Sequence, residues 1–161
     1  MIVHSEKCTG CRICELVCSW KKEKKFSPSL SRIRVASPYP EDGADRPKVC
    51  VQCTQALCST CGRDAMHRDE NAHTILIDEK KCNGCDKCTI SCPLGAIRLL
   101  SDRPLVIVCD LCEGDPECVK YCPTAAIEYS NPNEMRLRLQ RDSLRECLEI
   151  SFEEDPWRTG S

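Results

Sequence analysis

The sequence predicts an α+β fold in which short helices and short strands alternate with cysteine-rich loops. Segments that begin at Cys61, Cys92 and Cys122 align with one another, so a unit of cysteine loop, short helix and strand recurs along the chain. The apolar fraction of 41% includes all 17 cysteines among the 161 residues. Without them it falls to about 30%, which is low for a self-sufficient core. We therefore expect bound metal to supply part of the folding energy.

The regular elements are expected in the following order. Five short segments rich in β-branched or aliphatic residues are typical of strands. They are residues 1–3, 32–36, 74–78, 97–100 and 105–108. Residues 13–25 and 87–92 follow cysteine loops and are expected to be helices. Residues 38–47 contain an Asp-Gly pair and three prolines, which predict a surface loop.

The repeat covers residues 1–130 and ends at Asn131. Residues 131–161 are predicted to be a separate C-terminal tail. Asn133 is placed to cap a helix over residues 134–148, with Leu137, Leu144 and Leu148 on one face. The tail is either an arm that binds a partner or a helix that covers the domain.

Composition and charge restrict the setting in which the chain works. The N-terminus has no basic region, apolar stretch or twin arginine that would direct export, so a cytoplasmic location is expected. Disulfides are rare in that compartment, which favours metal ligation for the cysteines. No apolar run is long enough to cross a bilayer. The net charge of −2 does not favour nucleic acid as a partner.

Sixteen cysteines fall into four groups. The groups are Cys8, Cys11, Cys14 and Cys18; Cys50, Cys53, Cys58 and Cys61; Cys82, Cys85, Cys88 and Cys92; and Cys109, Cys112, Cys118 and Cys122. The first and third share the spacing C-x2-C-x2-C-x3-C of bacterial 4Fe-4S proteins, and the fourth has a longer central gap. Three thiolates on one tight loop can reach three irons of a cubane. The fourth thiolate lies on the departing helix and points toward a second cluster.

The second group, over residues 50–61, is irregular. Only two residues separate Cys58 from Cys61, and Gly62 stands where the third and fourth groups have proline. Taken alone, this spacing also fits a tetrahedral zinc site, so a zinc-binding interaction module is the alternative interpretation. A zinc ion that used all four thiols would leave the group at residues 82–92 without a fourth ligand. The cluster interpretation is therefore favoured.

Several other residues have local roles that the sequence suggests. Gly10 and Gly84 occupy the same place in their loops, where a residue without Cβ lets backbone N–H groups approach cluster sulfur. Cys147 is outside the four groups and is expected to be a small buried hydrophobe. A run of lysines follows the first group and either docks an acidic partner or forms a solvated helix face. These lysines are Lys21, Lys22, Lys24 and Lys25.

The segment KCTGCRICELVCSW, followed by FSPSLSRIRV, resembles the small iron-sulfur subunits of tungsten enzymes of the aldehyde oxidoreductase family. The resemblance covers residues 1–130. It implies two fused bacterial-ferredoxin-like modules and four 4Fe-4S clusters that relay electrons without catalysis on this chain. The implied partners are a large catalytic subunit with a tungsten pterin and a flavin or NAD subunit, or a soluble ferredoxin. Self-stacking of the chain is a further hypothesis.

The same resemblance implies a ligand set for each cluster, with outer motifs 8–18 and 109–122 paired and inner motifs 50–61 and 82–92 paired. Cluster A takes Cys8, Cys11, Cys14 and Cys122; cluster B takes Cys18, Cys109, Cys112 and Cys118; cluster C takes Cys50, Cys53, Cys58 and Cys92; cluster D takes Cys61, Cys82, Cys85 and Cys88. Each of the sixteen cysteines is used once. Cluster D depends on Cys61, whose spacing departs from the pattern.

Overall fold

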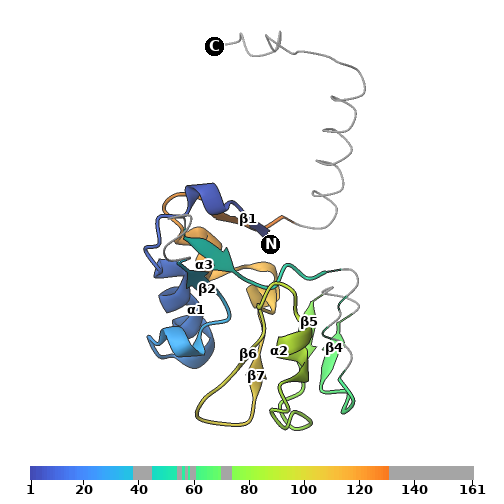
Figure 1. Ribbon diagram of the computed structural model, residues 1–161. Coiled ribbons are helices and arrows are strands. Elements are labelled where there is room, and N and C mark those ends of the chain that lie inside the picture. Colours follow the sequence, from blue (N-terminus) through green and yellow to red (C-terminus); the bar gives the residue numbers. More distant parts are fainter. Residues whose placement is uncertain (38–44, 54–55, 57, 59–60, 70–73, 131–161) are drawn as a thin grey trace, which may run out of the picture. The chain divides into compact units, whose positions relative to one another are not determined.

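The computed structural model describes residues 1–37, 45–53, 56, 58, 61–69 and 74–130. The chain divides into two compact units, Met1–Tyr129 and Ser130–Ser161. The fold described below belongs to the first unit (Figure 1). The predicted tail helix over residues 134–148, its proposed role as an interaction arm, and Cys147 all lie outside the described residues.

Within the described residues, the strands form four small antiparallel sheets of two strands each. β1 (Ile2–Val3) pairs with β8 (Ile127–Glu128), and β2 (Arg34–Ala36) pairs with β3 (Arg46–Lys48). β4 (Met66–Arg68) pairs with β5 (Ile75–Ile77), and β6 (Arg98–Leu99) pairs with β7 (Val106–Ile107). The topology is nested, because the first strand pairs with the last and the other sheets form between neighbours in the chain.

Each described α-helix begins one residue before the third cysteine of its group. The α-helices are α1 (Ile13–Glu23), α2 (Lys87–Ser91) and α3 (Glu117–Lys120), and the described 3-10 turns are η1 (Ser5–Lys7), η2 (Pro28–Leu30) and η4 (Leu111–Gly114). α1 packs against α3, and Figure 1 shows this pair close to β2. In the described part of the chain, every helix is too short or too polar to cross a bilayer.

Most of the elements predicted from the sequence are confirmed. All five predicted strands appear as β1, β2, β5, β6 and β7, and both predicted helices appear as α1 and α2. The loop predicted for residues 38–47 is wrong at its C-terminal end, because Arg46 and Pro47 belong to β3. Pro47 lies opposite Val35 in a sheet of only two strands, where a strand can lack one N–H donor.

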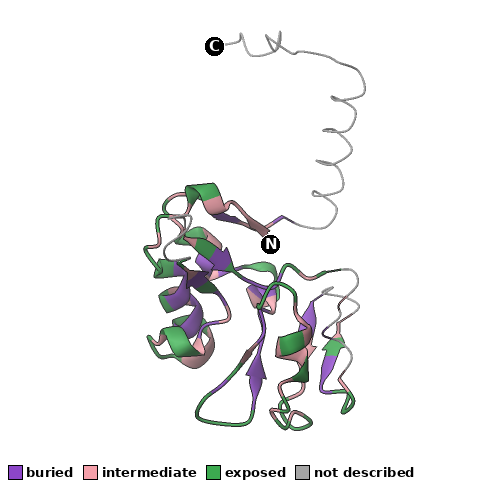
Figure 2. Ribbon diagram, viewed as in Figure 1, coloured by how far each residue is buried: buried purple, intermediate pink, exposed green. Residues whose placement is uncertain are grey.

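The core combines aliphatic side chains with cysteines. Ile33, Val35, Val49 and Ile127 are each at most 2% exposed. Six cysteines are buried in the same cluster: Cys14, Cys18, Cys50, Cys58, Cys109 and Cys118. Figure 2 shows buried residues along the inner sides of the strands and on one side of α1. The thiols thus occupy positions that aliphatic residues fill in other small domains, so the predicted ligands are also part of the core.

Candidate metal centres

Three cavities in the first unit are each lined by four of the predicted cysteines. Cavity A is lined by Cys8, Cys11, Cys14 and Cys122. Cavity C is lined by Cys50, Cys53, Cys58 and Cys92. Cavity D is lined by Cys61, Cys82, Cys85 and Cys88. In every case three cysteines come from one motif and the fourth comes from the motif predicted as its partner.

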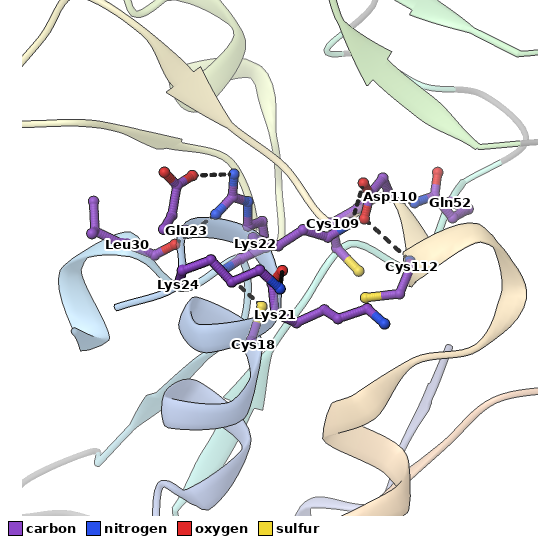
Figure 3. A network of polar contacts seen from close by, with 11 residues as sticks. Cys18, Lys21, Lys22, Glu23, Lys24, Leu30, Gln52, Cys109, Asp110 and Cys112 are labelled. Atoms are coloured by element: carbon purple, nitrogen blue, oxygen red, sulfur yellow. Dashed lines mark hydrogen bonds and ion pairs between the residues drawn. The ribbon is translucent and has the colours of Figure 1, made fainter. Parts of the chain in front are cut away.

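The remaining four predicted cysteines, which we call set B, gather where α1 meets α3. Set B consists of Cys18, Cys109, Cys112 and Cys118. Negative charge on Cys18 contributes to raising the pKa of each of the other three thiols, which reflects their proximity. Figure 3 shows Cys18, Cys109 and Cys112 from close by. Among the described residues, no three cysteine, histidine or acidic side chains converge closely enough to hold a single metal ion.

The four cysteine loops share one backbone conformation. The second residue after the first cysteine has a positive φ in every loop: Gly10 at 68°, Gln52 at 59°, Gly84 at 68° and Leu111 at 60°. This left-handed turn brings successive cysteines of the motif to the same cavity. The sequence indicated only the two glycines. Aligning the four loops on their first cysteines would have marked Gln52 and Leu111 as well.

Cys61 stands on the same turn as Cys92 and Cys122, whereas Cys18, the fourth cysteine of the first group, lies within α1. In each of these turns, the carbonyl oxygen of the cysteine accepts a hydrogen bond from the N–H of the residue three positions later in the chain. The distance is 3.0 Å for Cys61 and Cys92 and 3.3 Å for Cys122. That third residue has positive φ in each case: Asp64, Gly95 or Ala125. The shortened spacing and Gly62 therefore leave the local turn unchanged.

Backbone donors approach the thiols on these turns. Ala126 N–H donates to Cys122 Sγ at 3.3 Å, and Ala96 N–H donates to Cys92 Sγ at 3.4 Å. The N–H groups of Arg63 and Ala65 lower the pKa of Cys61. Burial acts to raise the pKa of Cys122, but N–H donors such as those of Thr124 and Ala126 outweigh it and lower the pKa. These donors stabilise negative charge on sulfur, as a cluster ligand requires.

Burial raises the pKa of several of the other thiols. It raises the pKa of Cys14 and Cys109 to about 12, with Glu15 adding to the effect at Cys14. It also raises the pKa of Cys50 and Cys88 to about 11. These thiols are neutral at pH 7 until a metal centre takes the place of their protons.

The cavities differ from set B in their exposure to solvent. Cavities A, C and D each have one exposed cysteine, which is Cys11, Cys53 or Cys85, the second cysteine of its loop. Set B has no exposed cysteine: Cys112 is half-buried and the other three are buried. Sets of four thiols without nitrogen or oxygen ligands suit iron-sulfur clusters. The residues present therefore fit the predicted cofactor.

Comparison with known proteins agrees with this donor chemistry. The family model described as "4Fe-4S dicluster domain" matches residues 44–131. The polyferredoxin-like subunit of aliphatic sulfonate oxidoreductase from Pyrococcus furiosus is 37% identical over 126 residues, which span 78% of this chain and 72% of that one. The B subunit of anaerobic dimethyl sulfoxide reductase from Escherichia coli is 32% identical over 154 residues, which span 83% of this chain and 74% of that one.

The name of a third relative states its role in electron transfer. The thiosulfate reductase electron transfer subunit PhsB from Salmonella typhi is 29% identical over 154 residues, spanning 86% of this chain and 79% of that protein. All three relatives are subunits of oxidoreductases. The chain therefore belongs to the 4Fe-4S dicluster domain family of iron-sulfur electron-transfer subunits.

Proposed function

We propose that the chain binds four 4Fe-4S clusters and relays single electrons through them inside a larger oxidoreductase. Clusters A, C and D would occupy the cavities of the same letters, and cluster B would be held by set B. Each cluster would take three ligands from one motif and one from its partner motif. The arrangement corresponds to two fused bacterial-ferredoxin-like modules within residues 1–130, with residues 131–161 as an interaction arm.

One observation carries this proposal. Three separate cavities are each lined by four cysteines, and each set combines the members that the crossed ligand pattern requires. Cys61 contributes to cavity D despite its irregular spacing. Thiols distributed in this way, with each set drawn from two motifs, favour four cubanes over a zinc site formed by residues 50–61 alone.

The contacts between the sets favour the order A, B, C, D for the relay. α1 provides Cys14 to cavity A and Cys18 to set B. The Gln52 amide, on the loop of cavity C, donates to the carbonyl oxygen of Cys109 in set B at 2.7 Å. α2 and the residue after it provide Cys88 to cavity D and Cys92 to cavity C. Bound clusters would supply the one-electron chemistry, while the protein holds, insulates and tunes them.

We propose a large tungsten-pterin subunit of the aldehyde oxidoreductase type as the catalytic partner. A flavin or NAD subunit, or a soluble ferredoxin, would exchange electrons at the other end of the relay. The residues from Lys7 to Trp20 support this choice by resemblance, and the relatives belong to oxidoreductases. A reducing compartment, the cytoplasm, suits a protein whose ligands must stay reduced until loading.

Metal and sulfide analysis of anaerobically purified protein tests the cluster number. Four cubanes predict about sixteen iron atoms and about sixteen acid-labile sulfides per chain. About twelve of each, together with one zinc, would instead support a zinc site at the second motif. Protein that contains zinc and no iron would overturn the proposal.

Substitution of one predicted ligand tests the crossed pattern. Cys61→Ser is expected to remove or convert only cluster D, which lowers iron by as much as about four atoms per chain. Cys147→Ser is the matched control, because Cys147 is outside the four sets, and its iron content is expected to stay unchanged. Full iron content in C61S, with an unaltered paramagnetic resonance spectrum, would contradict the assignment of Cys61.

Purification of the tagged chain from its native host tests the partner. A large subunit that contains tungsten is expected to copurify in a fixed ratio, and its size and metal follow from mass spectrometry and elemental analysis. Copurification with a molybdenum subunit would replace the tungsten assignment. Sedimentation of the same preparation shows whether copies of the chain stack.

A further inference from the structure

The environment of set B contains an ion pair that is not part of the ligand pattern. Lys22, on α1, donates from Nζ to Asp110 Oδ2 at 2.6 Å. Asp110 follows Cys109 directly, and its other oxygen, Oδ1, accepts the N–H of Cys112 at 3.1 Å. Figure 3 shows Lys22, Asp110 and the two cysteines together. The carboxylate thus joins a charged side chain to the loop that carries two predicted ligands.

This ion pair is withdrawn from solvent. The side chains of Lys22 and Asp110 are 19% and 32% exposed, whereas that of Lys21 is 44% exposed. Lys21 forms its own looser ion pair with Glu117 at 3.5 Å. Burial acts to lower the pKa of Lys22, but the hydrogen bond and charge of Asp110 outweigh it and raise the pKa, so Lys22 remains a cation. Its position shows that it is not available to dock an acidic partner.

The charges of the pair act on set B in opposite directions. Asp110 follows Cys109 in the chain and accepts the N–H of Cys112, so its negative charge lies beside two predicted ligands, while the positive charge of Lys22 lies 2.6 Å from the same carboxylate. A group that favours negative charge on a ligand sulfur also favours the reduced form of a cluster, which carries one more negative charge. The negative charge of Asp110 disfavours the reduced form of the cluster, and the positive charge of Lys22 offsets this effect.

We propose that Lys22 is a positioning residue that sets the reduction potential of cluster B by neutralising Asp110 and holding its side chain in place within the Cys109–Cys112 loop. This inference rests on the proposed function, since it requires a cluster at set B. It assigns a role to two residues outside the sixteen ligands. It also gives cluster B, whose predicted ligands include no exposed cysteine, a local charge balance that is independent of exposed surface charge.

The test is a potentiometric titration of the complete, cluster-loaded chain followed by paramagnetic resonance. Lys22→Gln leaves Asp110 uncompensated and lowers the midpoint of one cluster. Asp110→Asn keeps an oxygen to accept the Cys112 N–H but removes the charge, and it raises the midpoint of the same cluster. Each shift is expected to change the equilibrium constant for reduction by about threefold to tenfold, where tenfold corresponds to 59 mV for one electron. The double variant returns the midpoint toward its original value.

Two controls separate charge from packing. Lys21→Gln removes the same charge one residue earlier and is expected to move the midpoint less than K22Q does, because the Lys21–Glu117 ion pair is longer, at 3.5 Å, and Lys21 is more exposed than Lys22. Lys22→Arg keeps the charge and is expected to keep the midpoint. The inference is overturned if no midpoint moves in K22Q, if K22Q and D110N shift it in the same direction, or if K22R or K21Q shifts it as far as K22Q.

Failure of this inference differs from failure of the proposed function. Iron and sulfide are measured on every sample before titration. A sample with four clusters and an unmoved midpoint overturns the role of Lys22 alone. A sample of the unchanged chain with fewer than four clusters contradicts the proposed function. Cys112→Ser identifies the cluster B signal, because it alters the spectrum of the component held by set B.

Discussion

At the scale of single residues, backbone conformation determines which substitutions the cysteine loops tolerate. Gly84 has a φ of 68°, and a Cβ built on it would lie 2.8 Å from the Pro104 Cα. Gly95 has a φ of 57°, but a Cβ there would meet nothing within 4 Å. Ala125 occupies the corresponding position after Cys122 with a φ of 51°. One glycine is therefore favoured both by its φ and by a close approach, while the other is favoured by its φ alone.

Gly84→Ala is expected to destabilise the loop around cavity D. Left-handed backbone costs a residue with a Cβ roughly 1–2 kcal/mol, and the contact with the Pro104 backbone adds to that cost. Cluster loss in the presence of an iron chelator should therefore be several-fold faster than in the unchanged chain. Gly95→Ala is the matched control, because it carries the same left-handed strain without the close contact, so it should lose iron more slowly than G84A. Equal rates for G84A and G95A would contradict the role given to Pro104.

Cluster loading should depend on pH through the buried thiols. Cys14 and Cys109 have pKa values of about 12, so they hold protons at neutral pH and release them when iron binds. Raising the pH toward these values therefore favours loading, and lowering it opposes loading. Reconstitution of metal-free protein should give more cluster at about pH 8.5 than at about pH 6.5, with proton release in weak buffer. Loading that is independent of pH would show that these thiols are already ionised.

At the scale of elements, a few side chains hold the sheets and loops of the first unit together. Gln52 donates to the Cys109 carbonyl oxygen at 2.7 Å and accepts the Ile75 N–H at 2.8 Å. Arg98, on β6, donates to the carbonyl oxygens of Pro28, Ser29 and Ser31, the closest at 2.9 Å. Both side chains connect segments of inner and outer motifs.

Gln52→Gly is expected to loosen the junction between the loop of cavity C and set B. Glycine suits the positive φ at this position, as Gly10 and Gly84 do, so the substitution removes the amide without imposing strain on the backbone. Leaving the Cys109 carbonyl and the Ile75 N–H without their partner costs roughly 1–3 kcal/mol. The thermal midpoint of the loaded protein should fall, while its iron content stays the same. An unchanged midpoint would show that water replaces the amide at no cost.

The sequence predicted the elements whose own residues specify them strongly and missed those whose residues do not. The strand ending in Ile77 and the helix starting at Ile13 have clear aliphatic or amphipathic patterns, and both are confirmed. α3 has only four residues, which are too few to show a helical period. β3 contains a proline, a residue that is typical of loops. The left-handed conformation of Gln52 and Leu111 arises from the cysteine loop as a whole, so residue preference did not reveal it.

At the scale of the whole molecule, the cysteines are both predicted ligands and core residues. Six of them are buried among the aliphatic side chains, so the core of the first unit is poor in conventional apolar contacts. The low apolar fraction of the sequence predicts that folding depends on bound metal. Composition did not predict how the four sets are joined, because the contacts of Lys22, Gln52 and Arg98 depend on the tertiary fold.

Removal of iron is expected to unfold most of the first unit. Metal binding to sites that do not exist in the unfolded chain contributes directly to folding, and small domains have little stability to spare. Circular dichroism after anaerobic chelation should show loss of regular structure, and addition of iron and sulfide should restore it. A metal-free chain that unfolds cooperatively at the original denaturant midpoint would contradict this expectation.

The pairing of β1 with β8 also determines the order in which the motifs can be completed during synthesis. A ribosome releases the N-terminal motif first, yet the strand that completes its sheet, and Cys122 with it, emerge near the end of the described chain. The inner motifs and their sheets are complete earlier, because their partners are closer in sequence. The thiols of the first loop are therefore the first to be made and the last to meet their predicted fourth ligand, Cys122. Any factor that shields nascent thiols would matter most for the residues that are made first.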